Sequence, residues 1–139
     1  MGVALSEEIK TLFRDANFAH LATVMPDGSP QVAAVRADLE GDRILVCTGE
    51  TSLKARNTRR DPRVGLSVTS LANPYLEAQI RGRVVERKPD ADFRVMDRIS
   101  RKYTGKDFPW RQDPANRVVL VIEPERARYV ALPLTHAPA

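Results

Sequence analysis

The sequence of 139 residues has a single cysteine and only two histidines. One cysteine cannot form a disulfide within the chain, and these three residues match no recognised zinc-ligand spacing. The longest unbroken apolar run covers residues 118–122, far short of the roughly 20 residues that a membrane-spanning helix needs. Glu7 and Glu8 occupy the place of a signal peptide's apolar core, which argues against secretion. We therefore expect no metal site, no membrane span and a cytoplasmic protein.

Motifs of the common nucleotide-binding and hydrolase folds are also absent. The chain has no Gly-x-Gly-x-x-Gly fingerprint and no Gly-x-Ser-x-Gly nucleophile elbow. The segment Thr104-Gly105-Lys106 lacks the upstream glycine of a phosphate-binding P-loop. No residue pattern identifies a dedicated catalytic base. If a reaction needs a proton donor near its substrate, a bound water or an arginine would serve. These absences disfavour classical nucleotide folds and serine hydrolase chemistry.

Alternation of apolar and polar residues is the main structural pattern in the chain. Turn residues at 26–30, 40–42 and 73–74 separate the alternating segments, and Gly82 inside one of them indicates a bulge or a close backbone approach. We predict strands at residues 18–25, 31–38, 43–48, 64–71, 75–87, 117–122 and 127–132, with the last two interrupted at Pro124. We predict helices at residues 6–15 and 53–60, and a further helix that opens at Lys88-Pro89-Asp90 and has an apolar face of Phe93, Met96, Ile99 and Tyr103.

Six or seven mostly antiparallel strands with short inserted helices define the expected architecture. The length is typical of one domain, and no linker or repeat divides residues 1–139. The strand edges of such a small sheet must be closed internally or covered by a second copy of the chain. The predicted fold is therefore mainly β with short helices, a single-domain closed or split β-barrel.

The positive charge of the chain is concentrated in one segment. Lysine and arginine number 22 against 18 aspartates and glutamates, and residues 54–63 alone hold five cations against Asp61. This segment passes from a strand end through Ser52 into a helix, which suits phosphate binding by backbone N–H groups, a hydroxyl and the Lys54 ammonium. The alternative is a solvated cationic surface helix, in which more carboxylates would ordinarily be interspersed.

Three stretches together resemble a known family. They are LATVMPDGSPQV at residues 21–32, SLKARNTRRDPRV at residues 52–64, and the later Gly82-x-Val84. In this order they are similar to the pyridoxamine-5′-phosphate-oxidase-like split β-barrel flavoproteins. Within that superfamily the chain most resembles the short actinobacterial branch of flavin and deazaflavin oxidoreductases, many of which use coenzyme F420 in place of FMN.

The resemblance implies a homodimer that holds a flavin-type ring in a groove at the subunit interface. It also implies that Ser52 and Lys54 hold the cofactor phosphate. Members of the family often have an arginine beside the lysine, where this chain has Leu53, so Arg56 or Arg60 is expected to compensate. The remaining cofactor contacts that the resemblance implies are Gln31, Ala33 and Val35 of the second strand, Thr48 at the end of the third strand, and Asn57.

The function implied by the resemblance is F420-dependent reduction, in which a hydride passes from the reduced deazaflavin to a conjugated small molecule. The surplus of arginine favours F420, because its tail has several glutamates and FMN has none. The alternatives are an FMN-binding oxidoreductase and a non-catalytic cofactor carrier. Oxidation of pyridoxine phosphate is not expected, because members with that activity have extra terminal segments. Nucleic-acid binding is disfavoured, because no aromatic residues are interleaved with the cations.

Three further residues each have two interpretations. Cys47 lies inside an apolar strand and is expected in the core rather than in a redox role. His20 would serve as a proton donor only if it faced the groove. Trp110 either caps the cofactor groove or packs as an ordinary aromatic residue. The apolar face of the last predicted helix is expected to serve the core or a dimer contact.

Overall fold

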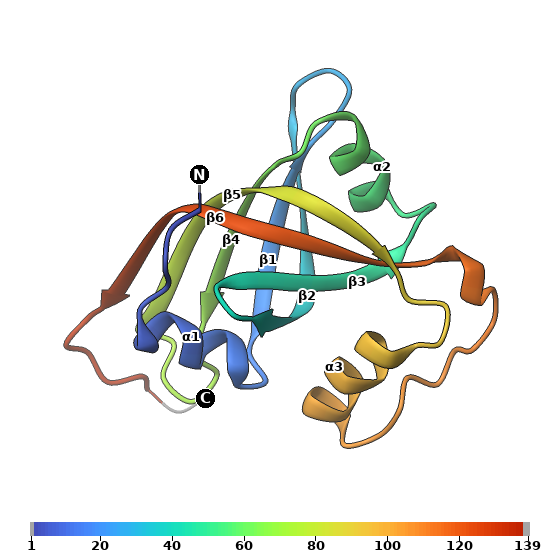
Figure 1. Cartoon of the computed structure of the whole chain (residues 1–139). Coiled ribbons are helices and arrows are strands. Elements are labelled where there is room, and N and C mark those ends of the chain that lie inside the picture. Colours follow the sequence, from blue (N-terminus) through green and yellow to red (C-terminus); the bar gives the residue numbers. More distant parts are fainter. Residues whose placement is uncertain (1, 138–139) are drawn as a thin grey trace.

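The computed structural model describes residues 2–137, which form six strands, three α-helices and one 3-10 helix (Figure 1). In chain order the elements are α1 (Glu7–Arg14), β1 (Phe18–Val24), β2 (Pro30–Glu40), β3 (Arg43–Gly49), α2 (Leu53–Arg60), β4 (Arg63–Thr69), β5 (Leu76–Pro89), α3 (Arg94–Thr104), η1 (Pro114–Asn116) and β6 (Arg117–Ala131).

The strands form one closed antiparallel barrel. They pair in the order β1-β2-β3-β6-β5-β4, and β4 pairs with β1 to complete the circle. Every neighbouring pair is antiparallel. The prediction of a mainly β barrel with short helices is therefore confirmed, and closure leaves no sheet edge among the described residues.

The two C-terminal strands that the sequence predicts are one continuous strand, so that prediction is wrong. β6 runs through Pro124, which lies opposite Gly82 of β5, and the register shifts between Arg81 and Gly82. A Cβ at Gly82 would lie 2.3 Å from the carbonyl oxygen of Glu123, so only glycine permits this close approach. The expected irregularity at Gly82 is thus present, and it is what allows a proline within the strand.

The predicted opening of the last helix at Lys88-Pro89-Asp90 is also wrong. Lys88 and Pro89 still pair with β6, and α3 begins only at Arg94. The buried Asp90 carboxylate accepts hydrogen bonds from the backbone N–H groups of Val95 and Met96, at 3.0 and 2.9 Å. Asp90 therefore satisfies the first turn from outside the helix, and the proline ends a strand instead of starting a helix.

The first helix confirms its prediction and closes one end of the barrel. The Ser6 hydroxyl accepts a hydrogen bond from the Ile9 N–H at 3.3 Å, which is a standard N-cap. Ile9, Leu12 and Phe13 are buried against the barrel core, which is built from the inward residues of all six strands. The alternating pattern of the strands is thereby explained by burial of one face.

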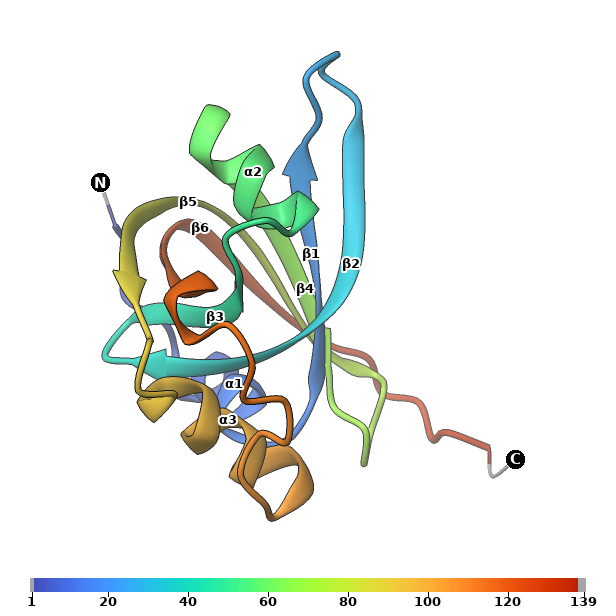
Figure 2. The same cartoon turned by 90° about the vertical axis from the view of Figure 1, so that its right-hand side faces the viewer.

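The other two helices lie outside the barrel on opposite sides of β3. Figure 2 shows α2 above this strand and α3 below it, with the chain that leads into β6 between them. Phe93, Met96 and Ile99 of the α3 region form an apolar cluster separate from the barrel core, which confirms a packing role for that face. Among residues 2–137, no helix is long and apolar enough to cross a membrane. The cytoplasmic location stays a prediction.

Candidate functional site

The turn between β3 and α2 is built around the Ser52 hydroxyl. This oxygen accepts a hydrogen bond from the Thr48 hydroxyl at 2.8 Å and another from the Ala55 N–H at 3.2 Å. A serine hydroxyl has two acceptor positions and one donor proton. Both acceptor positions are in use, so the Ser52 proton remains free to donate to an anion at the start of α2.

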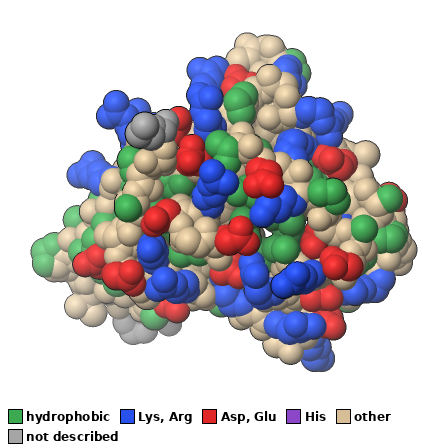
Figure 3. All heavy atoms as spheres, in the orientation of Figure 1, with side chains coloured by type: hydrophobic (Ala, Val, Ile, Leu, Met, Phe, Trp, Pro, Cys, Tyr) green, Lys and Arg blue, Asp and Glu red, His purple; other side chains and the backbone are tan. Residues whose placement is uncertain are grey.

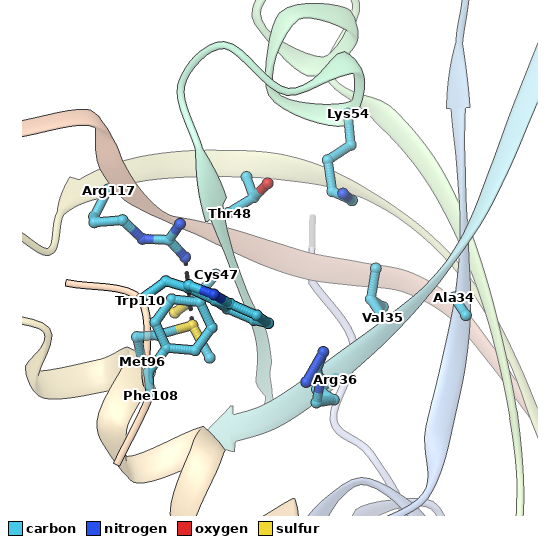
Figure 4. A pocket seen from close by; sticks show the side chains of 10 residues that line it. All are labelled: Ala34, Val35, Arg36, Cys47, Thr48, Lys54, Met96, Phe108, Trp110 and Arg117. Atoms are coloured by element: carbon cyan, nitrogen blue, oxygen red, sulfur yellow. Dashed lines mark hydrogen bonds between the residues drawn. The ribbon is translucent and has the colours of Figure 1, made fainter. Parts of the chain in front are cut away.

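Lys54 is the second predicted phosphate ligand, and its side chain points from α2 into a cavity (Figure 4). The side chain is half-buried, and burial lowers the pKa of its ammonium group. Among the described residues, the Lys54 ammonium forms no ion pair and no hydrogen bond. An ammonium that has lost water without gaining a partner is stabilised by a bound anion.

Two of the other four cations in the segment are neutralised by ion pairs within the chain. Arg59 forms a 2.7 Å ion pair with Glu50, and Arg63 forms one with Asp61 at the same distance. Figure 3 likewise shows basic and acidic side chains interspersed over one face of the molecule. The Arg56 side chain is exposed and has no ion-pair or hydrogen-bond partner among residues 2–137. The interpretation as a solvated surface helix therefore fits Arg59 and Arg63 but not Lys54.

Asn57 and Arg60 fasten α2 to the first strand. Asn57 is 1% exposed, and its side-chain amide donates hydrogen bonds to Thr23 Oγ1 at 3.0 Å and to Met25 Sδ at 3.3 Å. The Arg60 guanidinium donates to the Val24 carbonyl and to Asn57 Oδ1. The Asn57 side chain is almost fully buried and positions the helix, and its contact with a cofactor stays a prediction.

The cavity has a volume of about 240 Å³ and lies between β2, β3, α2 and the α3 region. Three predicted residues line it, namely Val35, Thr48 and Lys54. The predicted residues Gln31, Ala33, Ser52, Arg56, Asn57 and Arg60 do not line it. The lining is completed by Ala34, Arg36, Cys47, Met96, Phe108, Trp110 and Arg117.

The cavity meets β2 only at residues 34–36, and Gln31 and Ala33 come earlier in the strand. Val32, Ala34 and Arg36 are exposed on one face of β2, and Gln31, Ala33 and Val35 alternate with them. Val32 is 58% exposed, which is unusual for a valine in a barrel strand. Strand periodicity alone could have placed Arg36 on the exposed face beside the cavity, because it lies two residues beyond Ala34.

The wall opposite β2 comes from the segment after α3, which sequence reasoning considered only through Trp110. Phe108 and Trp110 pack edge to face with ring centroids 5.4 Å apart. The Asp97 carboxylate holds this segment by accepting hydrogen bonds from the Phe108 N–H at 3.0 Å and from Arg111 at 2.6 Å. The bond from Arg111 holds the pKa of Asp97 below its usual range, so this anchor stays charged at neutral pH.

Cys47 and His20 are the two residues whose proton or redox chemistry depends on their place relative to the cavity. Burial raises the pKa of the Cys47 thiol to about 12, so it stays protonated at neutral pH, in agreement with a packing role. His20 is exposed on β1 and does not line the cavity. The titratable groups that do line it are Lys54, Arg36, Arg117 and Cys47. With cations and no carboxylate, the cavity is built for an anionic ligand.

Comparison with known proteins agrees with this geometry. A family model described as pyridoxamine 5′-phosphate oxidase matches residues 5–131. A solved structure called F420 reductase is similar to the chain at 31% identity, with a TM-score of 0.82, over 89% of this chain and 98% of that one. Another, the conserved hypothetical protein Rv2991 from Mycobacterium tuberculosis, is similar at 27% identity, with a TM-score of 0.76, over 99% of this chain and 94% of that one.

A third solved structure, a putative pyridoxamine 5′-phosphate oxidase from Listeria innocua, has the same fold. It shares 22% identity and a TM-score of 0.65 over 88% of this chain and 95% of that one. No curated protein matches the chain. Because the family model spans nearly the whole barrel, from the residues before α1 to the end of β6, the chain belongs to the pyridoxamine 5′-phosphate oxidase family.

Proposed function

We propose that the protein is an F420-dependent oxidoreductase that reduces a conjugated small molecule. Family membership and the similar F420 reductase support an oxidoreductase of the flavin or deazaflavin type. The observation on which the proposal depends most is Lys54, a half-buried ammonium without a counterion among the described residues, directed into a cavity that no carboxylate lines. This is the environment that a cofactor phosphate requires.

The residues at the start of α2 fit the phosphate. Ser52 would donate its free hydroxyl proton, and Lys54 would add a full charge at close range. Both residues lie at the N-terminus of α2, where backbone N–H groups favour an anion. Val35 and Thr48 line the adjoining floor of the cavity and would contact the ring edge, together with the β2 backbone at Gln31 and Ala33. When bound, the reduced deazaflavin supplies the hydride.

We expect a second copy of the chain to complete the site. The cavity of about 240 Å³ is smaller than the roughly 300–1,000 Å³ of typical small-molecule sites. Next to it, β2 presents the exposed side chains of Val32 and Ala34, and exposed apolar side chains beside a site are typical of an interface. In a homodimer these residues would be covered, and the cavity would become a groove between two subunits.

Arg56 distinguishes the proposed cofactor from the alternative. It is exposed at the start of α2 and lacks an ion-pair partner among the described residues, so it is available to the glutamate tail of F420. FMN has the phosphate but no such tail, and would use Ser52 and Lys54 alone. A cofactor carrier would bind F420 in the same way and would differ only in failing to pass the hydride on.

The test is the affinity of full-length Lys54→Ala for F420. A hydrogen bond to a charged group contributes about 1.5–3 kcal/mol, so we expect the dissociation constant to rise roughly 10- to 150-fold. Lys10→Ala is the matched control, because Lys10 pairs with Asp42 at 3.3 Å and lies on α1, outside the cavity. If the two variants bind F420 equally well, Lys54 does not hold the phosphate and the proposal fails.

A further inference from the structure

The cavity has a second cationic corner that the phosphate site does not use. Arg117, the first residue of β6, lies beside Met96, Phe108 and Trp110, and Figure 4 shows it well separated from Lys54. Arg117 and Lys54 are therefore placed to bind different anionic groups. The contacts of the Arg117 guanidinium indicate the class of ligand that it can bind.

The contacts of the Arg117 guanidinium within the chain are weak: a hydrogen bond to a thioether and a cation–π contact. One terminal nitrogen, Nη2, donates to the Met96 sulfur at 3.4 Å, and a thioether is a weak acceptor. The guanidinium carbon lies 5.1 Å from the centre of the Phe108 ring. No carboxylate among residues 2–137 forms an ion pair with Arg117, although the nearby Arg111 has Asp97 at 2.6 Å.

One atom of Arg117 lacks even a weak partner. Nε is the one side-chain nitrogen or oxygen of the described residues that is buried without a hydrogen bond. Native structures rarely leave a buried donor unsatisfied, because its lost hydration is not repaid. Nε and a terminal nitrogen of arginine form a fork that matches the two oxygens of a carboxylate. Nε itself is closed to solvent, so an incoming carboxylate would meet the terminal nitrogens of Arg117, a residue that lines the cavity, and these nitrogens form a second fork of the same kind.

The surroundings of Arg117 favour a flat, conjugated ligand. Phe108 and Trp110 form an aromatic wall beside it, and Trp110 is 64% exposed. Across the cavity, the Arg36 side chain of β2 is exposed and has neither an ion-pair nor a hydrogen-bond partner among the described residues. Two unpaired arginines on opposite walls, next to an aromatic wall, provide both charge and a stacking surface.

We infer that Arg117, assisted by Arg36, binds the carboxylate of a planar conjugated substrate that packs against Phe108 and Trp110. This inference rests on the proposed function, since it assigns the phosphate corner at Lys54 to the cofactor and the Arg117 corner to the substrate. The same carboxylate chemistry is present in the glutamate tail of F420. The experiment must therefore separate a substrate carboxylate from a tail carboxylate.

The probes are trans-cinnamate and cinnamamide, which share a planar conjugated frame and differ in the carboxylate. Their affinities for the full-length, F420-loaded protein are measured by ligand-observed NMR titration. We expect cinnamate to bind at least tenfold more tightly than cinnamamide. Arg117→Met should reduce this preference to less than threefold, and Arg36→Met should reduce it by a smaller factor. Arg14→Met, which removes an exposed arginine of α1 that pairs with Glu7, should retain it.

Separate titrations of Arg117→Met with F420 and FMN identify the source of the carboxylate. The inference predicts that both cofactor affinities stay within about twofold of wild type. A loss of F420 affinity without a loss of FMN affinity would assign Arg117 to the cofactor tail and overturn the substrate assignment. Equal binding of cinnamate and cinnamamide by the wild type would overturn it as well, as would an unchanged preference in both arginine variants.

Two controls keep these outcomes apart from misfolding and from failure of the proposed function. Arg36 is exposed, so its variant remains a valid test if the Arg117 variant melts at a much lower temperature. If the wild type binds no F420, the proposed cofactor is wrong, and the cinnamate and cinnamamide titrations without cofactor still decide whether Arg117 selects a carboxylate.

Discussion

Arg87 of β5 is the residue whose removal should most clearly separate support of α2 from surface charge. Its guanidinium donates to Glu50 Oε1 at 2.7 Å, to the Ala55 carbonyl at 3.1 Å and to Thr58 Oγ1 at 3.1 Å. The Arg87 side chain is 22% exposed. It therefore ties the barrel wall both to the turn before α2 and to the helix itself.

Replacing Arg87 by methionine removes all three bonds while preserving most of the aliphatic stem. At about 1 kcal/mol for each bond, discounted because Glu50 remains solvated and paired with Arg59, the loss should be about 2–3 kcal/mol. For a domain of this size, that corresponds to a fall of roughly 8–12 °C in Tm. Affinity for F420 should fall as well, because Ser52 and Lys54 are carried by the helix that Arg87 supports.

The assay is thermal unfolding followed by circular dichroism, with Arg59→Met as the matched control. Arg59 pairs with the same Glu50 oxygen at 2.7 Å, but its side chain is 52% exposed, and such a surface pair contributes about 0–1 kcal/mol. Equal losses in the two variants would refute the support assigned to Arg87, and so would an unchanged Tm in Arg87→Met.

The pH dependence provides an independent check on the same pair. The hydrogen bond from Arg87 is the main cause that lowers the pKa of Glu50 from its ordinary value of 4.5. A lowered pKa in the folded state stabilises the protein above the ordinary value, and this stabilisation is lost as the pH falls below it. The difference in stability between wild type and Arg87→Met should therefore narrow between pH 7 and pH 3. A constant difference over this range would contradict the ion pair.

Two further predictions concern the barrel and its assembly. Gly82→Ala should lower the free energy of unfolding in urea by about 1–3 kcal/mol, because its Cβ would lie 2.3 Å from the Glu123 carbonyl oxygen. Gly65→Ala is the control and should lower it less, because the nearest atom to its Cβ would be 3.8 Å away. Equal losses in the two variants would contradict the close approach at Gly82. Sedimentation at micromolar concentration should give a dimer, and Val32→Arg should shift it toward monomer. A wild-type monomer would contradict the shared groove.

Local patterns were sufficient to predict most of the barrel. Alternating residues and turn residues placed all six strands, and the capping serines at 6 and 52 placed the first two helices. Both errors occurred at prolines, Pro89 and Pro124. In the local sequence a proline predicts the end of a strand, but whether the strand continues through it depends on the residues of the neighbouring strand. Gly82 lies on β5, far from Pro124 in sequence, so no local window contains both.

The candidate site was predicted on one side only. The β3 to α2 turn is a continuous stretch, so its hydroxyl and its lysine could be recognised together, and Lys54 lines the cavity. Arg117 is brought there by a chain segment that returns after α3, and no spacing within the sequence relates it to Arg36. Helix position alone does not show which side chain turns toward β1, so the contact of Asn57 with Thr23 could not be predicted.

The most direct test of the central claim is a titration of the purified, cofactor-free, full-length protein with F420 and, separately, with FMN, following the fluorescence of Trp110, the one tryptophan of the chain. The account predicts that both titrations quench this fluorescence and that the dissociation constant for F420 is at least tenfold lower than that for FMN. Tighter binding of FMN would preserve the phosphate site but contradict the deazaflavin assignment, and binding of neither would contradict the cofactor site at Ser52 and Lys54.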